Sequence, residues 1–284
     1  MNTFGFLNIN KPKGITSHDV IYKLRKIFGI KKIGHAGTLD PLASGVLPVA
    51  ISDSTRLLEY LEDDKKYVAY VKFGQSSATY DEEGEKSSYI KPSFIEEDLL
   101  AALGGFKGKI SQKPPIYSAI KIEGKKLYEF ARKGIETPEI PSRQVEVFDI
   151  DLLCFKNESA EVEIHCSSGT YIRSIAHDLG QKLGCGAYLA DLTRTSSGGF
   201  DIKNSVDIEN VKIENIINPL EVIRLPKYEI SENNFKKVEN GNSIELSGED
   251  GKIILTHLNK LVAIGNLSAN IVKMEKVFKM GAGK

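Results

Sequence analysis

The sequence predicts an α+β protein with a mixed, mainly antiparallel sheet in its larger part and a small all-β domain at its end. Strand and helix patterns follow one another irregularly, unlike the strict alternation of a doubly wound fold. A chain of 284 residues is long for one ordinary domain and short for three. Short strand-like runs separated by turn signals recur beyond Pro226.

The N-terminal segment combines a strand, a capped helix and a loop. Phe6–Asn10 is a short apolar run that predicts a strand. Thr16 or Ser17 can cap a helix whose apolar stripe runs to Phe28, and the glycine that follows ends it. Ile33–Val46 is rich in glycine and proline without a clean period, so we expect a long ordered loop. Loops of this length inside a compact domain are usually functional.

The middle of the chain carries further strands and helices. Alternating side chains predict strands at Lys66–Phe73, Val145–Phe155 and Glu161–Cys166. Helix patterns occupy Ser93–Leu103, which opens with a capping box, Lys125–Lys133, and Ile172–Leu183.

The C-terminal part separates from the rest near Pro226. Ile208–Leu225 is predicted as a helix or an irregular connection that ends at this proline. Beyond it, strands are expected at Lys252–Leu255, Leu261–Ile264 and Ile271–Phe278. We therefore expect a large domain of residues 1–225 and a small all-β domain of residues 226–284.

Composition narrows the class of protein. No apolar run is long enough to cross a bilayer, and the N-terminus lacks the pattern of a secretory signal, so no membrane partner is expected. The cysteines Cys154, Cys166 and Cys185 form no CxxC pair, which favours reduced thiols in the cytoplasm. The formal net charge of +0 argues against a uniformly basic surface. Lysines and acids nevertheless occur in separate clusters, which permit a local basic groove or mere solvated helix faces.

Asp40 stands out within the loop Ile33–Val46. Glycines around it permit close backbone approach, and Pro41 pushes it towards an extended conformation. His35 precedes it in the same loop. An acid held on such a loop can be catalytic, although composition alone favours an aspartate that closes a turn.

Several sequence blocks carry a resemblance to a known family. Gly34-His35-x-Gly37-Thr38-Leu39-Asp40-Pro41 resembles the signature of the bacterial TruB family of tRNA pseudouridine synthases. Further blocks that resemble this family follow in family order: Leu7–Gly14, Gln112–Lys121 with Gly124 and Leu127–Glu129, Cys166–Arg173 and Leu192–Arg194. The stretch Ser77-Ala78-Thr79 departs from the family, which tends to carry an acid there, while Asp81 and Gly84 fit.

The resemblance implies a pseudouridine synthase fold, with residues 106–143 as an insertion that clamps RNA. It implies that the C-terminal domain is PUA-like and binds RNA, although a purely structural cap remains an alternative. The implied activity is isomerisation of uridine to pseudouridine at position 55 in the T-loop of tRNA, after base flipping. The implied enzyme is a cytoplasmic monomer that needs no guide RNA. No cofactor and no metal are expected, and no nucleotide-binding or metal-ligand spacing is present in the sequence.

The resemblance also assigns roles to residues around the target base. Asp40 resembles the family's nucleophilic aspartate, which attacks C6 or C1′ or abstracts a sugar proton. Because burial disfavours an ionised carboxylate, a nearby cation is expected, and Arg173 matches the family's arginine. Tyr67 resembles the family's catalytic ring, which stacks on the uracil and could also act on its protons. Tyr171 and Leu192 would be further walls, and His35 would fill the space left by the flipped base or support its neighbour.

Basic residues in the matching blocks are candidates for contacts with RNA phosphates. They are Lys11, Lys13, Lys121, Arg132 and Arg194. The alternative for each of them is an ordinary surface residue that makes no contact with RNA.

Three other functions would place different requirements on the sequence. A guide-RNA-dependent relative would act within a larger complex, and the chain lacks obvious extra basic tails for such assembly. A non-catalytic RNA-binding protein or chaperone is disfavoured by the joint presence of Asp40, Tyr67 and Arg173. A metal-dependent hydrolase would have only His18, His35 and Asp40 as nearby ligand types, without a recognised spacing.

Overall fold

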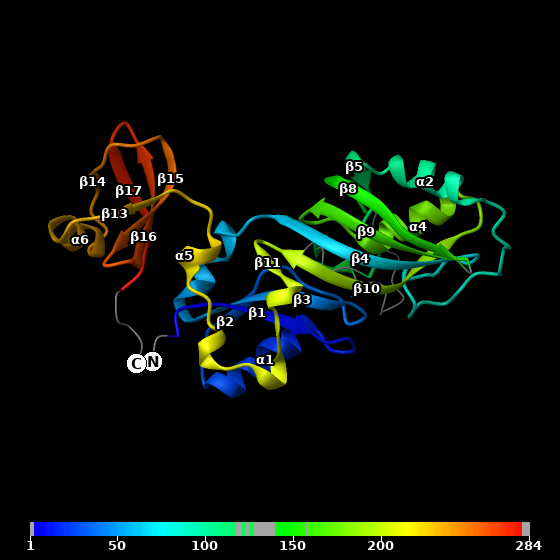
Figure 1. The fold of residues 1–284 in the computed structure, drawn as a ribbon, viewed down its shortest axis with the longest axis horizontal. Coiled ribbons are helices and arrows are strands. Elements are labelled where there is room, and N and C mark those ends of the chain that lie inside the picture. The colour runs from blue at the N-terminus through cyan, green and yellow to red at the C-terminus, as the bar shows by residue number, and fades with distance from the viewer. Residues whose placement is uncertain (1–2, 118–120, 123–124, 128–139, 157, 280–284) are drawn as a thin grey trace.

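The computed structural model describes residues 3–117, 121–122, 125–127, 140–156 and 158–279. In the elongated molecule of Figure 1, a small β domain lies at one end and helices α2 and α4 lie towards the other. Among the described residues, no helix combines the length and the apolar character needed to cross a membrane.

A ten-stranded sheet forms the larger part of the protein. Its strand order is β12-β1-β3-β10-β4-β9-β8-β5, with β11 on β10 and β2 on β3. The pairs β1–β12 and β3–β10 are parallel, and the remaining pairs are antiparallel. The strands are β1 (Gly5–Lys11), β2 (Ile33–His35), β3 (Ser44–Ile51), β4 (Asp64–Phe73), β5 (Gly108–Gln112), β8 (Arg143–Lys156), β9 (Ser159–Ser167), β10 (Ala187–Ser197), β11 (Phe200–Asp201) and β12 (Val206–Asp207). The predicted α+β class with a mainly antiparallel sheet is confirmed.

Three helices bury their apolar faces in one core with this sheet: α1 (Ser17–Phe28), α2 (Glu96–Gly104) and α4 (Ile172–Lys182). As predicted, the side chain of Thr16 caps α1, and Gly29 ends it in the left-handed conformation with φ 68°. Helix α2 begins later than its predicted capping box, because the Asp98 carboxylate accepts a hydrogen bond from the backbone N–H of Ile95. Short helical turns cover Ser52–Tyr60, Ile202–Asn204, Ile208–Asn210 and Ile213–Asn215, with α5 at Pro219–Val222.

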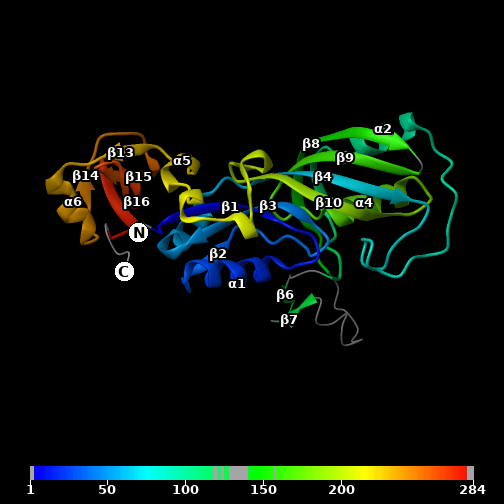
Figure 2. The same ribbon diagram turned by 60° about the horizontal axis from the view of Figure 1, so that its bottom comes forward.

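The structure corrects two predicted loops. The ends of Ile33–Val46 are strands β2 and β3, which pair with each other and leave only residues 36–43 as a loop. Within residues 106–143, β5 joins the edge of the main sheet through β8, whereas β6 (Lys121–Ile122) and β7 (Lys125–Lys126) form a separate hairpin. Figure 2 shows this hairpin projecting from the sheet. Lys125–Lys126 is therefore strand and not helix, and most of the predicted helix Lys125–Lys133 lies outside the described residues.

The C-terminal domain has its own five-stranded sheet, in the order β13-β15-β16-β17-β14. Its elements are β13 (Lys227–Glu229), α6 (Glu232–Glu239), β14 (Ile244–Glu245), β15 (Gly251–His257), β16 (Lys260–Ser268) and β17 (Ile271–Val277). The separate β domain is as predicted, but it also contains α6, which the sequence patterns did not indicate.

The small domain shares an apolar cluster with the main sheet. Phe6 and Leu57 from the large part pack with Ile264 and Phe278 from the C-terminal part. Polar contacts cross the same boundary, since Arg56 donates to the carbonyl of Val277 over 2.9 Å. Burial of this shared cluster docks the C-terminal domain against the sheet that carries the site.

Gly45 permits the close approach of β3 and β10. Its φ is +101°, and a Cβ at this position would lie 2.2 Å from the backbone oxygen of Arg194, its parallel partner. No side chain fits that space, and the backbone conformation is one that glycine adopts readily.

We predict that Gly45→Ala lowers the free energy of unfolding by about 1–3 kcal/mol, because strain and overlap act together. Gly104→Ala in α2 is the control, because no heavy atom lies within 4 Å of its added Cβ. That control should be neutral or stabilising by up to about 1 kcal/mol. Urea denaturation compares the two, and equal stabilities would contradict the prediction.

Candidate active site

The loop between β2 and β3 holds Asp40 through backbone contacts with the N-terminal segment. The Ser17 hydroxyl and Leu39 exchange hydrogen bonds of 3.0 and 2.8 Å, which tie the loop to the start of α1. The N–H of Gly14 donates to the carbonyl of Pro41 over 2.8 Å. Asp40 therefore has fixed neighbours on both sides, while its own side chain remains 43% exposed.

Arg173 lies beside Asp40, as the sequence predicts. One of its terminal nitrogens, Nη2, is 2.9 Å from Oδ2 of Asp40, and the arginine side chain is only 7% exposed. This nitrogen also donates to the carbonyl of Tyr117 over 2.9 Å. A buried guanidinium thus forms a charge-assisted hydrogen bond with a carboxylate that solvent can reach.

Asp81 is a second carboxylate on the same arginine, and sequence analysis had not assigned it a role. Its Oδ2 lies 3.3 Å from Nη1 of Arg173, and the residue is 6% exposed. The Thr79 hydroxyl and the N–H of Glu83 donate to its other oxygen. The only signal in the sequence was that Asp81 and Gly84 fit a family block. Within the departing stretch Ser77-Ala78-Thr79, a hydroxyl supplies the polar contact to this carboxylate.

The start of α4 is anchored to the segment that follows β5. Gln112 donates to the carbonyl of Tyr171 and accepts from its N–H, over 3.0 and 2.7 Å. The Ser174 hydroxyl donates to the carbonyl of Lys113 over 2.9 Å. The half-buried Tyr171 and its neighbour Arg173 are thereby held against the sheet edge.

Tyr67 and Leu192 lie on neighbouring strands, β4 and β10, and both are nearly buried. Burial raises the pKa of Tyr67, and the nearby Asp40 carboxylate adds to this rise while Arg194 opposes it. Tyr67 is therefore an uncharged phenol at neutral pH. It lies close enough to Asp40 for the charge of the carboxylate to affect its pKa. Its contact with a base stays a prediction.

His35 is half-buried beside the same loop. Burial lowers the pKa of His35, and the positive charge of Arg194 lowers it further. Its buried Nδ1 has no hydrogen-bond partner among the described residues. The ring is thus neutral at neutral pH, and its support of a flipped base or a neighbouring nucleotide stays a prediction.

Two of the predicted phosphate contacts are corrected by the structure. Lys11 is 0% exposed and donates to the carbonyls of Pro12 and Ile15 over 2.9 and 2.7 Å. Arg194 is also 0% exposed and donates to the carbonyls of Val46 and Gly37 over 2.7 and 3.2 Å. Both cations satisfy loop carbonyls inside the protein, so neither is placed to meet a phosphate.

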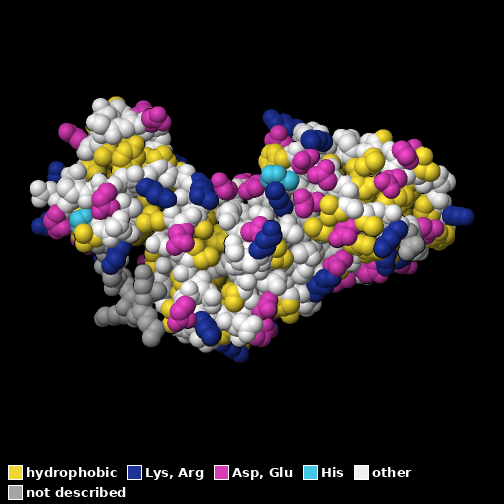
Figure 3. All heavy atoms as spheres, viewed as in Figure 1, with side chains coloured by type: hydrophobic (Ala, Val, Ile, Leu, Met, Phe, Trp, Pro, Cys, Tyr) yellow, Lys and Arg dark blue, Asp and Glu magenta, His cyan; other side chains and the backbone are white. Residues whose placement is uncertain are grey.

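Of the remaining basic candidates, the structure describes the side chain of Lys13 alone. Lys13 is exposed and pairs with Asp191 of β10, so its contact with RNA stays a prediction. Arg132 and the side chain of Lys121 lie outside the described residues. On the face seen in Figure 3, acidic and basic side chains are interspersed and do not form a single basic field.

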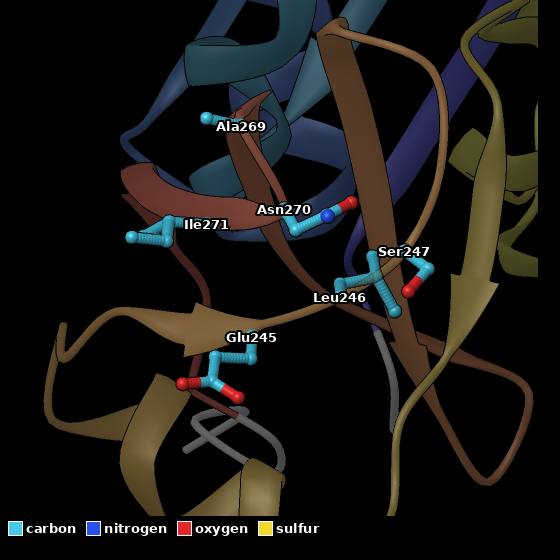
Figure 4. A pocket seen from close by; sticks show the side chains of 6 residues that line it. All are labelled: Glu245, Leu246, Ser247, Ala269, Asn270 and Ile271. Atoms are coloured by element: carbon cyan, nitrogen blue, oxygen red, sulfur yellow. The ribbon is translucent and has the colours of Figure 1, made fainter.

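A shallow hollow of about 440 Å³ lies apart from these residues, in the C-terminal domain. Figure 4 shows its lining, which is Glu245, Leu246, Ser247, Ala269, Asn270 and Ile271. It contains none of the predicted site residues. Among the described residues, no group of three His, Cys, Asp or Glu side chains is arranged to hold a metal ion.

Two family models and several relatives match this chain. Residues 25–172 match the model of the TruB family pseudouridylate synthase N-terminal domain, and residues 173–221 match that of the tRNA pseudouridylate synthase B C-terminal domain. A protein named tRNA pseudouridine synthase B from Lactobacillus johnsonii is 40% identical, over 95% of this chain and 97% of its own. One of the same name from Dehalococcoides mccartyi is 44% identical, over 87% and 85%.

Solved structures show the same fold. A chain in the crystal structure of a Cbf5-Nop10-Gar1 complex has a TM-score of 0.74 and 28% identity, over 98% of this chain and 85% of that one. A chain in an H/ACA RNP bound to a substrate RNA containing 2′-deoxyuridine has a TM-score of 0.73 and 26% identity, over 98% and 86%. The fold and the family models define a pseudouridine synthase, an isomerase. More closely, the chain belongs to the TruB family, as its sequence blocks predict.

We predict a stability signature for buried Lys11. Burial lowers the pKa of Lys11 from 10.5 to about 8, so between these values the unfolded chain binds more protons than the folded one. This group therefore makes the free energy of unfolding increase as pH rises through that window. Urea denaturation of the wild type and of Lys11→Met at several pH values between about 8 and 10.5 gives the difference in their free energies of unfolding. This difference isolates the contribution of Lys11, because the tyrosines titrate in both proteins. A difference that does not change with pH would contradict the prediction.

Proposed function

We propose that this enzyme isomerises uridine 55 in the T-loop of tRNA to pseudouridine, with Asp40 as its catalytic carboxylate. The observation that carries the proposal is the 2.9 Å ion pair between Arg173 and Asp40. It couples a buried cation to a carboxylate that remains 43% exposed and therefore accessible to a substrate. The tRNA substrate is supported by relatives named tRNA pseudouridine synthase B that match most of this chain.

The reaction breaks the bond between uracil N1 and C1′, turns the base and joins C5 to C1′. No net oxidation occurs, so a positioned carboxylate and a water-poor pocket can supply the chemistry. Asp40 attacks C6 or C1′ or removes a sugar proton, and each route needs its ionised form. Arg173 favours that form by its charge and by direct hydrogen bonding.

The target uridine has to leave its stack before it can meet Asp40. Aromatic and apolar side chains offset the cost, since stacking is worth roughly 1–3 kcal/mol per base. We propose Tyr67 as the ring that receives the uracil, with Tyr171 and Leu192 as further walls. His35, a neutral ring near the loop, would then occupy the space left by the flipped base or support the neighbouring nucleotide.

The proposed enzyme acts as a cytoplasmic monomer without guide RNA. Relatives at 40–44% identity carry the name tRNA pseudouridine synthase B, whereas the solved chains from complexes are 26–28% identical. We further propose that residues 106–143 grip the T-arm and that residues 226–284 touch RNA outside the target loop. Most of the former segment lies outside the described residues.

The proposal is tested with an unmodified tRNA transcript tritiated at C5 of its uridines, without added metal or guide RNA. Isomerisation releases that hydrogen into water. We predict release by the wild type, and a loss of about 1,000-fold or more in Asp40→Asn, equivalent to about 4 kcal/mol of barrier. Asp53→Asn, which removes an exposed partner of Lys32, is the matched control and should act within about twofold of wild type.

The outcomes of this experiment distinguish the stand-alone activity, the role of Asp40 and the position of the modified uridine. Absence of release by the wild type would overturn a stand-alone tRNA enzyme. Release that persists in Asp40→Asn would leave the activity but remove the aspartate mechanism. A transcript with cytidine at position 55 should release no tritium from its remaining uridines, and sequencing of the product locates the modified base.

We predict that Arg173→Met lowers the single-turnover rate at neutral pH while the affinity for tRNA holds. The variant leaves the buried Asp81 without its cation, which costs about 3–5 kcal/mol of stability. Arg173→Lys keeps a charge without the planar fork and should fall between wild type and Arg173→Met. Loss of tRNA affinity with an unchanged single-turnover rate would show a phosphate contact instead.

A further inference from the structure

Beside the ion pairs of Arg173, two aromatic rings stack to which the sequence patterns assign no role. Tyr80 immediately precedes Asp81, and His177 lies on α4. Their ring centroids are 3.8 Å apart and their planes differ by 15°. The pair therefore connects the loop that carries Asp81 to the helix that carries Arg173.

Helix α4 holds three consecutive loop residues. Arg173 and His177 are four residues apart, so they share one face of the helix. Arg173 binds the Thr79 carbonyl over 3.4 Å and the Asp81 carboxylate over 3.3 Å, while His177 stacks on the Tyr80 ring between them. The loop is thus fixed to two successive turns of one helix face.

This arrangement retains two unfavourable features. Tyr80 has φ 65°, a left-handed conformation that is unfavourable for a residue other than glycine. The buried Nδ1 of His177 has no hydrogen-bond partner among the described residues. Such features persist where the surroundings impose them, and they cluster at functional sites. Here the Tyr80 backbone is held at both ends, because its N–H donates to Ser77 and its carbonyl accepts from Leu189, over 3.1 and 3.0 Å.

We infer that Tyr80 and His177 are a positioning pair, which holds Asp81 against Arg173 and so orients the guanidinium towards Asp40. This inference rests on the catalytic use of Asp40 proposed above. The contact between Arg173 and Asp81 is 3.3 Å long, close to the outer limit of a hydrogen bond, so a small shift of the loop breaks it. Without the stack, residue 80 relaxes from its left-handed conformation and carries Asp81 with it.

The test measures single-turnover tritium release at saturating enzyme, together with the dissociation constant for tRNA. We expect His177→Leu to slow the rate about tenfold with unchanged affinity, and His177→Phe to recover to within about threefold because its ring can stack. Tyr80→Asn should also slow the rate, since asparagine tolerates the left-handed conformation but removes the ring. Phe148→Leu is the control, because it removes an aromatic contact with His165 in the large domain, with a centroid distance of 4.9 Å, at an exposed residue outside the proposed site.

A wild-type rate in His177→Leu would overturn the inference. So would a His177→Phe rate as low as that of His177→Leu, because stacking would then not be the cause. Weaker tRNA binding with an unchanged rate at saturation would overturn it in favour of an RNA contact. If His177→Leu does not fold, the single-turnover rates of Tyr80→Asn and Tyr80→Phe are compared. A slower rate in Tyr80→Asn than in Tyr80→Phe, which keeps a ring, supports the inference, and equal rates overturn it. Activity in Asp40→Asn would instead mark a failure of the aspartate mechanism, which these variants do not test.

Discussion

The guanidinium of Arg173 is the group on which the rest of the site depends. It is almost buried, yet it meets Asp40 at 2.9 Å and Asp81 at 3.3 Å. A buried cation without partners is strongly destabilising, so these carboxylates stabilise the folded protein whatever their chemical role. Because its partners come from the loop before β3 and from the loop after β4, one side chain fixes the relative positions of segments distant in the sequence.

Exposure within the site follows from this arrangement. Arg173 and Asp81 lie inside the protein, where the low dielectric strengthens their attraction, whereas Asp40 is 43% exposed. The carboxylate proposed to meet the substrate is therefore the solvent-exposed end of a buried network. In this chain of contacts the Tyr80–His177 stack is linked to Arg173 through Asp81, and not through Asp40, so its proposed role is to position the site and not to contact the substrate.

Buried cations also bind backbone carbonyls in and around the loop that carries Asp40. Lys11 donates to carbonyls in the turn after β1, and Arg194 donates to carbonyls of Gly37 and Val46 on either side of Asp40. Both residues therefore bind backbone carbonyls inside the protein and are not placed to bind RNA phosphates. Gly45 permits this close approach, because β3 and β10 meet in parallel at Arg194 with no room for a side chain.

The sequence by itself determined the α+β class, the limits of α1, the positions of strands β1, β4, β8 and β9, and the pairing of Asp40 with Arg173, whereas strands β3 and β10 were not indicated. These features are local, such as the Thr16 cap and the Gly29 end, or they are carried by motifs of the family. Tertiary structure alone decided that Ile33–His35 pairs as a strand, that Lys11 and Arg194 are buried, and that Asp81, Tyr80 and His177 converge on α4. The physical reason is that short strands, buried charges and ring stacks gain their stability from partners distant in the chain, which no local pattern specifies.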